Sequence, residues 1–128
     1  MNTNVKLVVL HTERNFPIRF EFVNTFEGTR NGFNHKSEMR YWNMETSGNM
    51  YWTEKVHYIN RTWETYQYRT AMIKTVDRAM KFYKRVKLRE KFLDEFGYTN
   101  LRGRDKQFEK WCEGNQILKD LQAAKNSL

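Results

Sequence analysis

The spacing of hydrophobic residues along the chain changes near residue 60, from the two-residue period of strands to the three-to-four-residue period of a helix. Val5–Leu10 is a short, nearly continuous apolar run that favours a buried strand. From Phe16 to Phe22 aromatic and aliphatic residues alternate with charged ones, as in a half-buried strand, and Pro17 indicates an edge position or a strand start. We expect these two strands to pair as a hairpin.

A second hairpin is expected to follow the first. Two segments rich in Tyr, Trp and Val, about 33–44 and 50–59, flank a polar stretch whose Ser-Gly pair at 47–48 is typical of a turn. Residues 27–32 are expected to form the loop between the hairpins, with Asn31-Gly32 as its turn.

The register of this hairpin decides which side chains face inward. In one register Met39, Tyr41, Val56 and Tyr58 share the inner face, and a shift of one residue would exchange the faces.

Residues 60–96 contain neither Gly nor Pro, which predicts one long helix. Asn60 or Thr62 is expected to cap its first turn, without the Glu or Gln three residues later that would complete a capping box. Gly97 is the expected residue just past its C-terminal end.

At about 100° per residue, this helix separates apolar from basic residues. The apolar face comprises Met72, Ile73, Val76, Ala79, Met80, Tyr83 and Val86. A stripe roughly 80° wide on the other side comprises Lys74, Arg78, Lys81, Arg85 and Arg89. Three further cations, Lys84, Lys87 and Lys91, widen the positive field toward the flank of the helix. One side is therefore expected to be buried and the other to carry positive charge.

These elements predict the α+β class: a four-stranded antiparallel sheet of two hairpins, then a long basic amphipathic helix and a C-terminal helix. The last helix is expected over residues 105–124, with Gly114 as a position where it could be interrupted. A chain of 128 residues forms one domain by this interpretation, with residues 1–59 mainly β.

The charge balance narrows the class of partner. The net charge is +8, from 23 basic and 15 acidic residues, and the pI is about 9.7, which favours polyanions. Cys112 is the single cysteine, so an intramolecular disulfide is excluded and a reducing, cytoplasmic location is expected. No apolar run is long enough to span a membrane, so no membrane partner is expected.

The basic stripe is the main candidate interface. From Lys74 to Arg89 it extends roughly 22 Å along a straight helix, enough to contact several phosphates independently of sequence. The alternative is an ordinary solvated helix face. Trp42 and Trp52, with Arg40 beside them, are candidate stacking residues, unless the helix or a second copy of the chain covers them.

One arrangement could support catalysis. His35 or His57 as general base, with Glu38 as its partner, would suit a small metal-independent ribonuclease, and one hairpin register places Glu38 opposite His57. An exposed cross-strand ion pair explains the same spacing. The histidine and cysteine spacing matches no metal site, and we expect no cofactor.

Two strings carry a resemblance: Gly-Phe-Asn-His at 32–35 and Tyr-Ile-Asn-Arg-Thr-Trp-Glu-Thr-Tyr at 58–66. They resemble small proteins of phages and mobile elements of Gram-positive bacteria, over roughly residues 32–75. The resemblance implies an accessory protein that acts by binding, such as an anti-CRISPR or other anti-defence inhibitor. DNA-mimicking inhibitors are acidic, whereas this chain is basic, so a nucleic acid or a nucleoprotein complex such as a host defence nuclease is the implied target.

The sequence therefore predicts a non-catalytic protein that binds nucleic acid or a nucleic-acid-handling complex through its basic helix face. The ribonuclease is one alternative. A structural homo-oligomer, such as a dimer that buries the hairpin aromatics, is the other.

Overall fold

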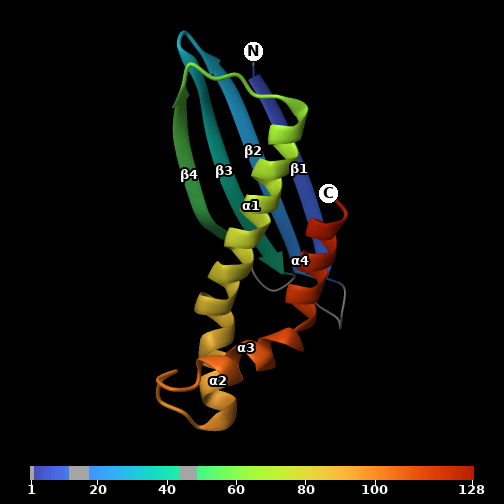
Figure 1. Ribbon diagram of the computed structural model, residues 1–128. Helices are drawn as coiled ribbons and strands as arrows, with labels where there is room; N and C mark the ends of the chain where they lie inside the picture. The colour runs from blue at the N-terminus through green and yellow to red at the C-terminus, as the bar shows by residue number, and fades with distance from the viewer. Residues whose placement is uncertain (1, 12–17, 44–48) are drawn as a thin grey trace.

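The computed structural model describes residues 2–11, 18–43 and 49–128, and it has the expected α+β architecture (Figure 1). The strands are β1 (Asn2–His11), β2 (Ile18–Thr29), β3 (Gly32–Asn43) and β4 (Asn49–Ile59). The helices are α1 (Thr65–Tyr83), the π-helical segment η1 (Lys84–Leu88), α2 (Arg89–Phe96), α3 (Asp105–Glu113) and α4 (Gln116–Asn126). The expected strand start at Phe16-Pro17 and the expected turn at Ser47-Gly48 lie outside the described residues.

The sheet has the order β1-β2-β3-β4, and each strand is antiparallel to its neighbour. The connection between β2 and β3 is shorter than the loop expected over residues 27–32. Thr29 pairs with Gly32, so the turn consists of Arg30 and Asn31 alone. Gly32 is required there because a Cβ atom would overlap the carbonyl oxygen of Tyr58 on β4.

One face of the sheet forms the main core with α1 and α4. The buried residues of this core are Val9, Phe20, Phe22, Met39, Tyr41, Met72, Val76, Ala79 and Leu121. The expected inner face of the second hairpin is confirmed. Met39 and Tyr41 are buried in the core, while Val56 and Tyr58 lie half-buried on the same side, toward α1.

The first helix begins at Thr65, five residues later than expected. Asn60 has a φ of 56° and donates its backbone N–H to the carbonyl of Asn31, so it turns the chain away from the sheet. Glu64 is the N-cap residue, and its backbone N–H donates to the Gln67 side-chain oxygen at 3.2 Å, as in a capping box. The expectation of a plain cap at residue 60 or 62 is therefore wrong.

The helical run then continues to Phe96, with a change of hydrogen bonding in η1. The backbone N–H of Arg89 donates to the carbonyl of Lys84, five residues earlier. This extra residue shifts the buried face, so that Leu88 is 2% exposed and Val86 is 39% exposed. The expectation that Val86 is buried is therefore wrong, and a π-helical turn is the reason. Gly97 ends the helix with a φ of 69°, as expected.

The far end of this helix belongs to a second core, which we call the helical lobe. Its buried residues are Leu88, Phe92, Phe108, Cys112 and Leu118. Figure 1 shows the helix passing beyond the end of the sheet to reach α2 and α3, and α4 returning beside it toward β1.

The C-terminal helix expected over residues 105–124 is two helices. Helix α3 ends at Glu113, and the Asn115 side chain caps α4 by accepting the Leu118 backbone N–H at 3.0 Å. The break lets Leu118 pack in the lobe while Leu121 reaches the main core. His11 and Asp120 then join β1 to α4, with Nδ1 and Oδ2 2.6 Å apart.

The π-helical turn predicts that Leu88 contributes much more than Val86 to the free energy of unfolding. Leu88→Ala should lower the free energy of unfolding by about 2–5 kcal/mol, because it opens a cavity in the helical lobe. Val86→Ala should change it by no more than about 0.5 kcal/mol, because that side chain is partly in solvent. Urea denaturation of both variants measures the difference. A larger effect at Val86 would show that the helix continues as a regular α-helix.

Candidate functional site

A groove of about 290 Å³ lies between α1 and the helix-facing side of β3 and β4. It forms because α1 packs over β2 and β3, so that the edge strand β4 lies to one side of the helix (Figure 1). The residues that line it from the sheet are Phe26, Phe33, His35, Ser37, Glu54, Val56 and Tyr58. Those that line it from α1 and the segment before it are Arg61, Tyr66, Gln67, Thr70, Ala71, Lys74, Thr75 and Arg78.

Asn24 organises a polar cluster beside the groove. Its side-chain oxygen accepts hydrogen bonds from His35 Nε2 at 2.6 Å and Ser37 Oγ at 3.0 Å. The Thr75 hydroxyl lies 3.2 Å from the same oxygen and shares its one hydrogen between it and the Ala71 carbonyl at 2.8 Å. Its amide nitrogen donates to the sulfur of Met72 at 3.3 Å. Three elements, β2, β3 and α1, therefore meet at one buried side chain. A buried polar group of this kind stabilises the fold only when its hydrogen bonds are made.

His35 is held in its neutral form. Burial lowers the pKa of its imidazole, and the positive charge of Arg78 lowers it further. Its ring stacks on Phe26 with the centroids 4.6 Å apart. Because the Asn24 oxygen can only accept, Nε2 carries the proton and Nδ1 is the unprotonated nitrogen. In the described part of the chain no hydrogen-bond partner of Nδ1 is found.

Charged side chains surround the groove. Arg78 of α1 forms an ion pair with Glu54 of β4, and the two side chains are 56% and 41% exposed. Arg61 and Lys74 line the same groove. Of the charged residues that line it, three are therefore cationic and one is acidic.

Exposed cations continue from the groove along the helix. We call Lys74, Arg78, Lys81 and Arg85 the cation row. At about 100° per residue they fall within roughly 60° of arc, and they extend about 16 Å along the axis. Asp77 is the one acidic residue of α1, and it pairs with Lys125 of α4 at 2.7 Å. Asp77 is four residues from Lys81, at the edge of the cation row, but its carboxylate is directed to α4.

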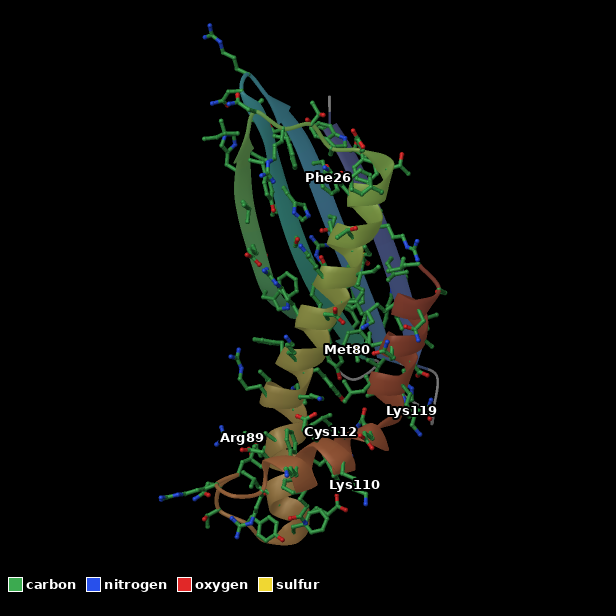
Figure 2. All side chains as sticks on the ribbon, in the orientation of Figure 1. Phe26, Met80, Arg89, Lys110, Cys112 and Lys119 are labelled. Carbon is green, nitrogen blue, oxygen red and sulfur yellow. The ribbon has the colours of Figure 1, made fainter. Side chains whose placement is uncertain are left out.

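The remaining basic residues predicted for this interface are placed differently. Lys84 bridges to Glu109 of α3 at 2.7 Å and so supports the helical lobe. Lys87 takes part in another interaction within the protein. Arg89 and Lys91 are exposed on α2, beyond η1. Figure 2 shows Arg89 on the side of the molecule where β4 lies.

The hairpin residues predicted to join the interface do not lie beside the cation row. Arg40 is on the outer face of the sheet, where it pairs with Glu38 at 3.5 Å. Trp42 is half-buried on that same outer face, opposite Arg19 of β2. Trp52 is half-buried on the inner face, packed against the main core.

The three residues predicted for catalysis are not brought together. His35 faces the helices, whereas Glu38 and His57 are on the outer face. In the observed register Thr53 is opposite Glu38 and Asn34 is opposite His57, so the register that paired Glu38 with His57 is wrong.

Each of the three has a local partner instead. His57 Nδ1 lies 2.7 Å from the side-chain oxygen of Asn34, and Glu38 pairs with Lys36 at 3.0 Å. His35 belongs to the Asn24 cluster described above.

Among the residues that the structure describes, no group of three His, Cys, Asp or Glu side chains is arranged to hold a metal ion. Burial raises the pKa of the Cys112 thiol to about 11, so it is protonated at neutral pH. No described helix is both long enough and apolar enough to cross a membrane.

Sequence reasoning missed the groove and several residues that line it, among them Glu54, Arg61 and Tyr66. The groove depends on where α1 crosses the sheet, which no local pattern records. One signal was present: Gln67, Thr70 and Lys74 recur at helical spacing on the side of α1 that faces β4.

The lowered pKa of His35 predicts that stability depends on pH. The unfolded chain takes up this proton near pH 6.5, whereas the folded protein resists protonation until a lower pH. The contribution of His35 is thus fully present above pH 6.5 and is lost as the pH falls below it. Urea denaturation at pH 7 and pH 5 should show a smaller loss of stability for His35→Gln than for the wild type. Equal losses would contradict the assignment.

Comparisons of the chain with protein-family models, with well-characterised proteins and with solved structures find no match.

Proposed function

We propose that this protein is a non-catalytic nucleic-acid-binding protein that holds a phosphate backbone along the cation row. The observation that carries the proposal is the row itself: four exposed cations at three-to-four-residue spacing, uninterrupted by an acidic side chain of the same helix. An ordinary solvated helix places opposite charges four residues apart, where they stabilise each other. Within α1 the single carboxylate at such spacing is Asp77, four residues before Lys81, and it pairs with Lys125 of α4 at 2.7 Å instead.

The chemistry of the row suits phosphates. Arg78 and Arg85 present guanidinium groups that can contact two phosphate oxygens at once, while Lys74 and Lys81 act as point charges. The Arg85 guanidinium lies 5.2 Å from the centroid of the Phe82 ring, a contact that orients it. A span of about 16 Å covers several phosphates of one strand. Such binding depends strongly on salt and weakly on sequence.

The outer face of the sheet is less suited to a polyanion, because its charges alternate in sign. Glu21 pairs with Lys6 at 3.0 Å and with Arg19 at 3.7 Å. Glu38 is similarly placed between Lys36 and Arg40. Each carboxylate lies between two cations, so the outer face has one carboxylate for every two of these cations, whereas the four cations of the row face one carboxylate, Glu54. The proposal therefore assigns the backbone to the helix.

The more specific target remains a prediction from the resemblance to phage and mobile-element proteins. A nucleoprotein complex, such as a host defence nuclease, would present phosphates to the same row. Pull-down from a bacterial host tests that version separately.

The proposal predicts the response of affinity to salt. We expect labelled single- and double-stranded DNA and RNA to bind the wild type in fluorescence anisotropy, with log Kd rising linearly with log salt concentration. Arg78/Lys81/Arg85→Ala should reduce that slope by about 2–3, since each of the three lost phosphate contacts removes about 0.7–0.9.

A matched control variant loses the same number of positive charges from another surface. Lys106, Lys110 and Lys119 are exposed on α3 and α4, and Figure 2 shows Lys110 and Lys119 on the side of the molecule away from Arg89. Their triple replacement by Ala removes three positive charges and should leave most of the slope in place. Equal losses in the two variants would mean that net charge alone drives binding. The absence of binding at low salt would refute the proposal.

A further inference from the structure

The groove beside the cation row has the size of a small-molecule site. Its volume of about 290 Å³ is near the lower end of the roughly 300–1,000 Å³ typical of ligand pockets. A group of about one nucleoside fits such a space, whereas a base pair within a duplex stack does not. The groove is bounded by β3 and β4 on one side and by α1 on the other.

Its walls suit a flat ring with polar edges. The half-buried Tyr58 ring stacks on the buried Phe33 ring behind it, with the centroids 4.8 Å apart, and Val56 adds an aliphatic surface. Gln67 and Thr70 supply hydrogen-bonding groups from α1. Nucleobases combine an apolar face with donors and acceptors at the edge, and they bind proteins by stacking on aromatic rings.

The charged groups around the groove suit a ligand that is also an anion. Arg61, Lys74 and Arg78 outnumber the single carboxylate of Glu54. Lys74 and Arg78 belong to both the groove and the cation row, so a ligand in the groove is continuous with a strand on the row.

We infer that the groove binds one unpaired base of a single strand whose phosphates lie along the cation row. This inference rests on the proposed function and makes it specific: the ligand is single-stranded nucleic acid. In a duplex the bases are stacked and paired, and their faces are not available to Tyr58.

The ion pair across the groove acts against the ligand. Glu54 holds the Arg78 guanidinium and adds a negative charge where the phosphate of the bound nucleotide would approach. Entry of a nucleotide therefore requires Arg78 to exchange a carboxylate for a phosphate. Glu54 reduces the affinity for any anion that enters the groove.

The test compares three labelled probes of equal length at one salt concentration: a single-stranded oligodeoxyribonucleotide, a duplex, and a strand whose sugars carry no bases. The single strand should bind the wild type about tenfold more tightly than the strand without bases, because base stacking is lost in the latter. Equal affinity for these two probes would overturn the inference while the proposed function stands. No binding of any probe would overturn both.

A groove-filling variant locates the base. Ala71 lines the groove and is half-buried, and Ala71→Leu narrows the space without a change of charge. This variant should bind the single strand up to tenfold more weakly and the strand without bases within twofold of the wild type. Ala123→Leu on the exposed side of α4 is the matched control. Circular dichroism and thermal unfolding verify that both variants fold.

Removal of the Glu54 carboxylate should raise the affinity for the single strand, whereas filling the groove should lower it. Glu54→Gln should bind the single strand several-fold more tightly, because it frees Arg78 and removes one repulsion. Glu113→Gln, an exposed residue of α3, makes the same change in net charge and should have little effect. An equal gain in both variants, or an unchanged affinity of Ala71→Leu for the single strand, would place the strand outside the groove and overturn the inference.

Discussion

The packing of α1 across β2 and β3 positions the groove, the Asn24 cluster and the cation row. Val76 and Ala79 have no exposed surface, and they pack in one core with Phe20 and Phe22 of β2. Burial of one such aromatic side chain contributes about 1.5–3 kcal/mol, so this contact dominates the core. Because α1 crosses at β2 and β3, β4 extends beyond it and the groove forms. The same orientation places Lys74 and Arg78 of the cation row at the groove and leaves Lys81 and Arg85 exposed beyond it.

A polar contact makes this packing specific. Apolar surfaces tolerate small shifts, whereas the Asn24 oxygen must meet donors from β3 and α1 at once. A rotation of α1 would withdraw Thr75 and Met72 from the Asn24 side chain, so the amide nitrogen would lose its contact with the Met72 sulfur. The cluster also fixes the tautomer of His35 at the edge of the groove. Asn24 therefore links the position of α1 on the sheet to the tautomer of His35 in the groove.

Features set by interactions between residues close in sequence could be predicted, whereas features set by tertiary packing could not. Strand alternation is local, so the inner positions of Phe20, Phe22 and Met39 were predictable. The cap at Glu64 was missed because it depends on how the chain leaves β4. The π-helical turn was missed because lobe packing, and not helix propensity, selects Leu88 over Val86. The groove was missed for the same reason, since it exists only after α1 has docked.

The helix that starts beside the groove also ends in a separate core, and Met80 and Tyr83 contact both cores. Figure 2 shows Met80 between the sheet and the lobe that contains Cys112. Local opening of the lobe breaks the contacts around Phe92 and leaves those around Phe22 in place. Amide hydrogens of α2 and α3 therefore have a route to exchange with solvent that those of the central strands lack. One helical run therefore joins two cores that can open separately.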